Sequence, residues 1–346
     1  MGIKVSVCIV TYKSNSLLKK CLKSLSHQTN SPKFELVIVN NDPNDNTPDI
    51  ILNEFQHLKC LRKIICVNSK NNIATARALA ANKSKGEYIV YTDPDCLLPN
   101  NWLSLHLSNF LAAKQIDSRI TATGSCFEVP HNGDFFLKLI GALYKNSFAQ
   151  LKSPQGLHPD NSIYVDHIPT LNAFYQRSAI NELGSFDPFF NYVCEDVDLG
   201  FRNIEHGHRN QMFASPSVQH CITNNLKDWI SRCLKYGMGQ SYVISKHKRA
   251  QLRHFFVFLY TALLILTPFY LDSALIGFTW LCYFLTLILK LNWDFVRGKI
   301  EIDLALGLIP IILITHFFYG LGFAYGFLKY LFIIVGGNRY EYSSQH

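Results

Sequence analysis

Gly86-Glu-Tyr-Ile-Val-Tyr-Thr-Asp-Pro-Asp95 is a short run of β-branched and aromatic residues that ends in two aspartates. The run predicts a buried strand closed by Pro94, so Asp93 and Asp95 should stand at its C-terminal end. In open α/β sheets, ligands bind at that edge. Two carboxylates with one residue between them point to similar sides of an extended chain, and their oxygens suit Mg²⁺ or Mn²⁺. A plain Asp-Pro turn at the end of a strand stays open as the alternative.

The first hundred residues alternate between strand and helix patterns. Polar turn residues occupy 40–48, directly after the second strand pattern. This βαβ alternation predicts a parallel sheet with right-handed crossovers that can bind a nucleotide. The sequence has no Gly-x-Gly-x-x-Gly after its first strand and no Walker loop, which argues against a Rossmann dehydrogenase and a P-loop NTPase. Strands are expected at 5–12, 34–39, 63–67 and 86–92, and helices at 16–26, about 48–56 and 73–83.

A second acidic cluster, Glu195-Asp-Val-Asp-Leu-Gly-Phe-Arg202, follows about a hundred residues later. Acids in the first turn of a helix complement its dipole, and Asp198 and Arg202 have the spacing of an i, i+4 ion pair. That is the structural interpretation. The chemical one is a general base, and a helix end would satisfy both because it can aim a carboxylate at a bound ligand.

Taken together, these motifs resemble those of family 2 glycosyltransferases of the GT-A fold. The resemblance covers roughly residues 3–222 and implies an α/β nucleotide-diphospho-sugar transferase fold with a mostly parallel sheet flanked by helices. The motifs that carry it, in chain order, are Val10-Thr-Tyr12, Leu22-x-Ser24-Leu25-x-x-Gln28, Ala76-Arg77, Asp93-x-Asp95, Leu183-Gly-Ser-Phe-Asp187, Glu195-Asp196, Asp198, Arg202, Gly207 and Pro216-x-Val-x-His220.

The resemblance also implies roles for individual residues. Asp196 is the expected general base for an inverting transfer, with Glu195 as the close alternative. The implied ligands of Mg²⁺ or Mn²⁺ are Asp93, Asp95 and His220. The implied contacts to a nucleotide-sugar donor come from Thr11, Tyr12, Asn40, Arg77 and Asp93.

Three positions depart from the family pattern. Asn40 stands where an Asp is usual, Asn72 where a Gly is usual, and Ala78 where an Asn is usual. An amide both donates and accepts, so Asn40 can still pair with the edge of a uracil or thymine base. A UDP-sugar or dTDP-sugar is therefore the favoured donor.

The C-terminal third is strongly apolar. Residues 254–271, 273–289 and 304–328 contain no Asp, Glu, Lys or Arg, and segments of this length can span a membrane. Three or four transmembrane helices are expected, with re-entrant or interfacial helices left open. The expected organisation is a catalytic domain at 1–228, a basic and aromatic juxtamembrane linker at 229–253, a transmembrane region at 254–338 and a short polar tail at 339–346.

The distribution of charge favours membrane lipid over nucleic acid as a partner. Residues 1–245 carry 24 basic and 20 acidic side chains, or +4, and residues 246–346 carry 9 and 5, also +4. The basic residues of the second part flank the apolar segments, which predicts an integral protein of the cytoplasmic membrane whose catalytic domain faces the cytoplasm. Ten scattered cysteines without a Cys-x-x-Cys pair agree with reduced thiols in that compartment.

The segment Trp229-Ile-Ser-Arg-Cys-Leu-Lys-Tyr-Gly-Met-Gly239 precedes the apolar region. It resembles a pattern of membrane-attached family members that build surface glycans, which implies acceptor contacts from Trp229, Arg232 and Tyr236. An interfacial amphipathic helix with an aromatic anchor is the alternative interpretation. No Gln-x-x-Arg-Trp signature of processive synthases is present.

The resulting hypothesis is a non-processive, inverting, metal-dependent glycosyltransferase that acts on a lipid-linked or nascent surface polysaccharide at the cytoplasmic membrane face. Two alternatives stay open. One is a polyprenyl-phosphate glycosyltransferase, whose acceptor is already ionised. The other is a membrane-bound sugar-nucleotide binding protein with a decayed catalytic site.

Overall fold

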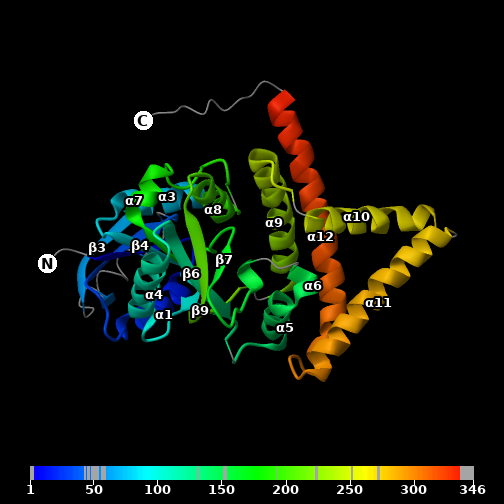
Figure 1. Cartoon of the computed structure of the whole chain (residues 1–346), viewed down its shortest axis with the longest axis horizontal. Coiled ribbons are helices and arrows are strands. Elements are labelled where there is room, and N and C mark those ends of the chain that lie inside the picture. The colour runs from blue at the N-terminus through cyan, green and yellow to red at the C-terminus, as the bar shows by residue number, and fades with distance from the viewer. Residues whose placement is uncertain are drawn as a thin grey trace. The chain divides into compact units, whose positions relative to one another are not determined.

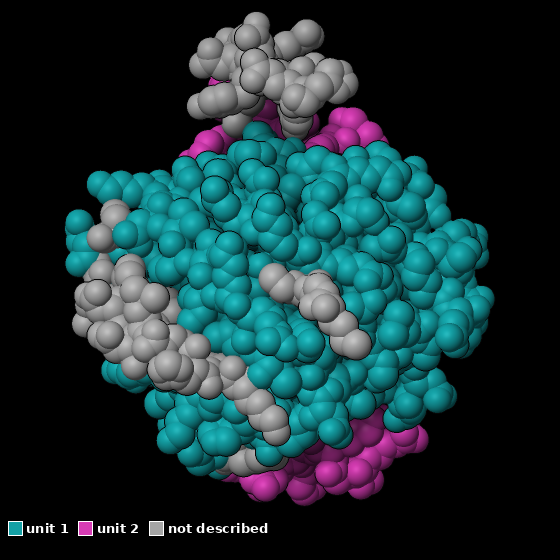
Figure 2. Space-filling model, turned by 90° about the vertical axis from the view of Figure 1, so that its left-hand side faces the viewer, with its two compact units in different colours: residues 1–141, 152–222 teal, residues 142–151, 223–346 magenta. Residues whose placement is uncertain are grey.

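The computed structural model describes residues 4–42, 44, 47, 54–55, 60–130, 132–150, 154–191, 193–222, 225–250, 252–270 and 273–335. These residues form two compact units, coloured separately in Figure 2. One consists of residues 1–141 and 152–222, and the other of residues 142–151 and 223–346. The sequence predicted a boundary at 228, whereas the second unit begins at 223 and also includes residues 142–151. The helix expected at 48–56 falls largely outside the described residues, and the polar tail lies wholly outside them.

The first unit is built on a nine-stranded sheet in the order β3-β2-β1-β4-β8-β6-β9-β5, with β7 paired to β9 (Figure 1). The first four strands are parallel, as predicted, with β1 between β2 and β4. Beyond β4 the sheet is mixed, because β8 runs antiparallel to both β4 and β6. The strands are β1 (Val5–Thr11), β2 (Phe34–Asn40), β3 (Leu61–Asn68), β4 (Tyr88–Thr92), β5 (Cys96–Leu97), β6 (Ile120–Glu128), β7 (Ile163–Val165), β8 (Asn172–Gln176) and β9 (Arg209–His220).

Helices pack on this sheet through apolar side chains. Every residue of β1, β2 and β4 is buried, as expected for parallel strands covered on both faces. The core joins these strands to α3 through its alanines and to α8 through Leu199. The helices of this part of the chain are α1 (Asn15–Ser26), α3 (Ile73–Lys83), α4 (Trp102–Ile116), α5 (Phe135–Lys145), which continues into the second unit, α7 (Arg177–Glu182) and α8 (Glu195–Glu205).

The second unit is helical. Two of its helices are long and apolar enough to cross a membrane, Ala274–Val296 and the stretch Ile302–Phe332. A shorter apolar helix, Phe256–Phe269, precedes them. The region expected as a linker is mostly helical. Its helices are α6 (Ser147–Gln150), α9 (Leu226–His247), α10 (Leu252–Leu266), α11 (Ala274–Val296) and α12 (Ile302–Val335).

Candidate active site

The polar ends of the parallel strands meet at one edge of the sheet. In the register of β1 and β2, Thr11 lies beside Asn40, while Thr92 at the end of β4 pairs with Ile9. Asp93 follows Thr92 directly, so the first aspartate stands at the C-terminal edge, where the sequence placed it. This edge is the one at which open α/β sheets bind ligands.

Arg77 joins the two acidic clusters. Its Nη2 donates to Asp93 Oδ1 at 2.9 Å, and its Nη1 donates to Glu195 Oε1. The Arg77 side chain is 9% exposed and that of Glu195 is 4% exposed. On the other side of the helix, the hydroxyl of Tyr91 donates to the carbonyl oxygen of Arg77 at 2.9 Å. The guanidinium therefore supplies a counter-charge to the buried carboxylate of Glu195 and also pairs with the partly exposed Asp93; an ionised carboxylate buried without such a partner would be costly.

Asp95 and His220 form a second pair at the same edge. The imidazole Nε2 lies 3.2 Å from Asp95 Oδ2, because β5 pairs Cys96 directly with His220. The ligand atoms of Asp95, Cys96 and His220 lie within 4.8 Å of one another. Burial raises the pKa of the Cys96 thiol well above its usual range. A carboxylate and an imidazole at this separation fit a divalent cation, and Asp95 and His220 are the residues that would hold it.

The structure thus brings together only two of the three metal ligands predicted from the sequence. Asp95 and His220 are in contact, whereas Asp93 is the ion-pair partner of Arg77. Cys96 is the residue near this pair that the sequence analysis did not consider. Its position next to Asp95 was visible, but its proximity to His220 depends on the pairing of β5 with β9.

Glu195 and Asp196 open α8, as the helix interpretation predicted. The residue before the helix, Cys194, has a φ of +69°, which turns the chain sharply into the first turn. Asp196 Oδ2 accepts from the backbone N–H of Thr170 at 3.3 Å. Asp196 is 8% exposed and, unlike Glu195, has no guanidinium among its described hydrogen-bond partners.

The third acid of the cluster has a structural role. Asp198 accepts from Arg202 Nε at 2.8 Å, in the predicted i, i+4 pair. The same guanidinium donates to the carbonyl oxygens of Leu183 and Ser185 at 2.5 and 2.7 Å. Arg202 therefore links the turn of the Leu-Gly-Ser-Phe-Asp motif to α8.

The residues expected at the nucleobase differ in accessibility. Tyr12 is 58% exposed, whereas Thr11 is 1% exposed and Asn40 is fully buried. The amide of Asn40 donates to Asp42 O at 2.7 Å and to Asn68 Oδ1 at 3.1 Å, and its Oδ1 accepts from the Asp42 N–H at 3.1 Å. Asn40 thus closes the turn after β2, a role that an ionised Asp would fill less completely because it has no donor.

Asn72, the second departure from the family pattern, caps α3. Its Oδ1 accepts from the Thr75 N–H at 2.8 Å, and its Nδ2 donates to Pro188 O at 3.0 Å. A side chain that satisfies a free N–H at the start of a helix stabilises that helix. Arg77 lies on this helix, so the cap helps to fix the guanidinium that bridges the acids.

The predicted acceptor residues lie on α9 in the second unit. Trp229 is 1% exposed, its Nε1 donates to Thr315 Oγ1 at 2.8 Å, and its ring meets the edge of Tyr144 at 5.8 Å. A sugar cannot stack on this ring while these contacts hold, so the expected acceptor role of Trp229 is contradicted by its burial. Arg232 and Tyr236 are half-buried on the same helix.

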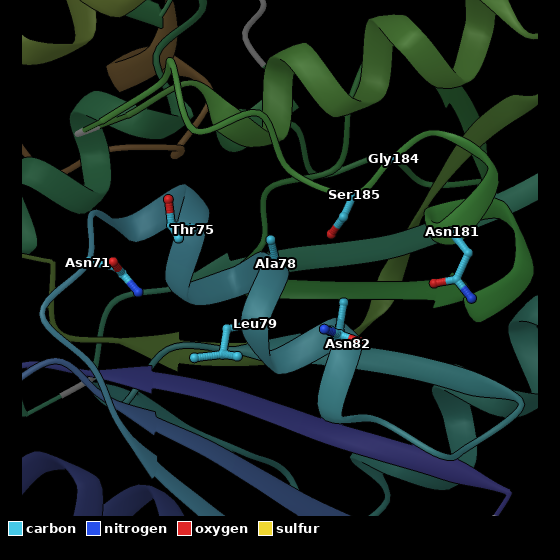
Figure 3. A pocket seen from close by; sticks show the side chains of 9 residues that line it. Asn71, Thr75, Ala78, Leu79, Asn82, Asn181, Gly184 and Ser185 are labelled. Carbon is cyan, nitrogen blue, oxygen red and sulfur yellow. The ribbon is translucent and has the colours of Figure 1, made fainter. Parts of the chain in front are cut away.

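A hollow of about 470 Å³ on α3 does not coincide with these clusters (Figure 3). Its polar groups are neutral amides and hydroxyls, so it offers no charge for a diphosphate or a metal ion. The residues that line it are Asn71, Thr75, Ala78, Leu79, Ala81, Asn82, Asn181, Gly184 and Ser185.

Comparison with known proteins agrees with this architecture. Residues 6–182 match the family described as glycosyl transferase family 2. An uncharacterized glycosyltransferase of Rickettsia bellii is 30% identical over 138 residues, which cover 38% of this chain and 19% of that protein. The uncharacterized glycosyltransferase MJ1057 of Methanocaldococcus jannaschii is 22% identical over 286 residues, which cover 79% of this chain and 92% of that protein. The chain thus spans under a fifth of the first relative and most of the second.

A solved structure shares the fold. The mannosyltransferase PcManGT from Pyrobaculum calidifontis, in complex with GDP-Man and Mn²⁺, aligns with a TM-score of 0.57 and 18% identity. The alignment covers 94% of this chain and 87% of that one. At this level of identity the likeness concerns the GT-A fold alone, and the mixed sheet with its flanking helices is the feature in common.

Proposed function

The chain belongs to glycosyl transferase family 2, and on that premise we propose that it is an inverting, metal-dependent, non-processive glycosyltransferase. Its donor is a nucleotide-diphosphate sugar, and its acceptor is a lipid-linked or nascent surface polysaccharide at the cytoplasmic membrane face. The observation that carries the proposal is the Arg77 bridge, because it brings the Asp-x-Asp and Glu-Asp clusters to one edge of the sheet.

Asp196 is the base in this proposal. Arg77 neutralises Glu195, and a carboxylate held by a guanidinium is a weaker proton acceptor, so the neighbouring acid is the better candidate. As the acceptor oxygen forms its bond to the anomeric carbon, its proton passes to Asp196 and the bond to the diphosphate oxygen breaks. The products are the glycosylated acceptor and a nucleoside diphosphate, and inversion follows from attack on the face opposite the leaving group.

Asp95 and His220 are the proposed ligands of Mg²⁺ or Mn²⁺. The bound cation would neutralise the charge that develops on the leaving diphosphate. Arg77 holds Asp93 through an ion pair, and in this proposal Asp93 contacts the donor beside Asp95 and His220. The Mn²⁺ complex of the structural neighbour supports a divalent cation in this proposal.

The donor base is the least constrained part of the proposal. UDP-sugars and dTDP-sugars are favoured from the sequence pattern at Asn40, while in the structure the Asn40 amide hydrogen-bonds to Asp42 and Asn68 within its own turn. The neighbour's complex with GDP-Man makes a GDP-sugar the necessary comparison.

Turnover by the purified full chain tests the proposal. Release of nucleoside diphosphate from a panel of UDP-, dTDP- and GDP-sugars is measured with a lipid-linked glycan fraction as acceptor. Asp196→Asn should lower turnover by about 10²–10⁴-fold, the usual contribution of a general base, and leave donor binding intact. Glu205→Gln, an exposed acid at the other end of α8, is the matched control and should keep full activity.

Other outcomes separate the alternatives. Full turnover by Asp196→Asn would contradict the assignment of the base. Transfer to a polyprenyl phosphate that survives Asp196→Asn would support the phosphate acceptor, because that oxygen is already ionised. Donor binding without any release of nucleoside diphosphate would identify a decayed site.

A further inference from the structure

Helix α9 runs beside the C-terminal half of α12. The contacts advance in step along both helices, so the two helices are parallel to each other (Figure 1). A Cβ added to Gly237 would lie 2.0 Å from the Tyr319 carbonyl oxygen, so the backbones touch at that point. Further pairs are Trp229 with Thr315 through a 2.8 Å hydrogen bond, Gly322 with Leu234, Gly326 with Met238, and Tyr242 with Tyr330 at 6.2 Å between ring centroids.

Charged residues on α9 exclude it from the hydrocarbon core. Lys227, Asp228 and Lys235 are exposed on this helix, which does not qualify as a candidate span. A charged side chain at the centre of a bilayer costs about 2.5–3.5 kcal/mol on insertion scales. If α12 crossed the membrane along its whole length, it would draw α9 and these charges into the core. The half of α12 that lies against α9 is therefore placed at the membrane surface.

Helices α10 and α11 form a hairpin whose base is fixed to α12. Thr261 Oγ1 donates to His316 O at 3.3 Å, and Tyr283 Oη lies 3.0 Å from His316 Nδ1. Trp280 packs edge-on against Tyr260 at 5.7 Å, which joins the two arms. Polar and aromatic groups of this kind prefer the interface between lipid head groups and acyl chains.

Beyond this base the hairpin projects away from α12 (Figure 1). Its apolar side chains are exposed. From Thr261 to Phe269 the first arm has eight residue steps, and helical rise gives it a length of about 12–14 Å. The hydrocarbon core is about 30 Å thick, so one leaflet is about 15 Å. The exposed large apolar residues of the projecting part are Ile265, Leu266, Phe269, Tyr270, Leu275 and Phe278.

We propose that this hairpin is a re-entrant wedge seated in a single leaflet of the bilayer, with α9 and α12 lying along the membrane surface. Basic residues at both ends of the hairpin then reach the same layer of head groups. Arg297 stacks on the ring of Trp293 at 4.2 Å, next to Lys299. Lys248 and Arg249 precede α10. Two apolar helices of spanning length thus anchor the chain without crossing the membrane.

Labelling of single introduced cysteines tests the wedge, which rests on the membrane attachment in the proposed function. The parent is the full chain with Cys282→Ser, because Cys282 is exposed. Lys299→Cys, Lys329→Cys and Ser273→Cys are each added to it. A membrane-impermeant maleimide is applied to intact cells, to inverted membrane vesicles and to detergent extracts, and the parent without an added cysteine gives the background.

We expect Lys299→Cys and Lys329→Cys to be labelled from the same side, although they lie at opposite ends of α12. Ser273→Cys, next to Asp272 at the tip, should be labelled only in detergent. Labelling of Lys329→Cys from the side opposite to Lys299→Cys would overturn the proposal, and so would labelling of Ser273→Cys from the far side. Recovery of the chain in a carbonate-washed supernatant would instead contradict membrane attachment itself. Turnover by each variant shows that it is folded.

Discussion

The guanidinium of Arg77 donates to the carboxylate of Glu195, which lies 118 positions later in the chain. The same side chain holds Asp93 at 2.9 Å, so one residue of α3 aligns the acids that follow β4 with those that open α8. In the structure Arg77 positions the carboxylates of Asp93 and Glu195, whereas the family resemblance implied that it contacts the nucleotide. Both roles are compatible, because a guanidinium has five N–H donors.

Arg77→Lys should keep the charge and lose the bridge, because an ammonium lacks the planar fork that reaches two carboxylates. We expect kcat to fall about 10²-fold, the usual effect of misplacing reacting groups by about 1 Å, with a smaller change in the donor KM. Steady-state kinetics measure both constants. Arg62→Lys, at an exposed position on β3, is the control. Wild-type kcat in Arg77→Lys would show that the bridge has no catalytic role.

His106 should make the stability of the first unit sensitive to acid. Its Nε2 lies 2.8 Å from Asn172 Oδ1, the side chain is 1% exposed, and burial lowers its pKa from 6.5 to about 4. Well above pH 6.5 the imidazole of His106 is neutral in both the folded and the unfolded chain. As the pH falls from 6.5 to 4, the unfolded chain is protonated first, so folding loses about 3 kcal/mol at 1.36 kcal/mol per pKa unit.

Chemical denaturation at several values between pH 4.5 and 7.5 measures this loss. The wild type should lose stability more steeply with falling pH than His106→Gln, whose amide does not titrate. Equal slopes for the two proteins would show that folding does not lower the pKa of the His106 imidazole.

Gly237→Ala should destabilise the helical unit. The added methyl group meets the Tyr319 carbonyl oxygen at 2.0 Å, so α9 and α12 must separate. Overpacking of this kind costs about 1–3 kcal/mol. Gly277→Ala on α11 is the matched control, since its Cβ meets nothing within 4 Å and alanine favours a helix. The measurement is the Tm of the detergent-solubilised protein, and equal Tm values for the two variants would contradict the close approach of the helices.

Much of the first unit could be predicted from the sequence. Strands β1, β2 and β4 are short, largely apolar runs that alternate with helical patterns, which predicts a parallel sheet covered on both faces. The helix that begins at Glu195 was likewise predictable, because acids in its first turn and the Asp198–Arg202 spacing are local signals.

Residue roles that depend on tertiary contacts could not be predicted. Asn40 and Asn72 looked like departures at a nucleotide site, but one closes a turn and the other caps a helix. Trp229 was expected to stack on a sugar, but its side chain is buried and its N–H donates to Thr315, which lies 86 residues later on α12. The approach of Cys96 to His220 likewise depends on a strand pairing that no local pattern reports.

The most direct test of the account is isothermal titration of the detergent-purified chain with UDP, dTDP and GDP, each in Mn²⁺ and in EDTA. Wild type, Asp95→Asn, His220→Gln and Cys96→Ser are compared. We predict that one nucleotide binds in Mn²⁺, that EDTA, Asp95→Asn and His220→Gln each remove this binding, and that Cys96→Ser retains it because Asp95 and His220 are the proposed ligands. Binding that is equally strong in EDTA and in Asp95→Asn would contradict a metal site at Asp95 and His220, and with it the proposed mechanism.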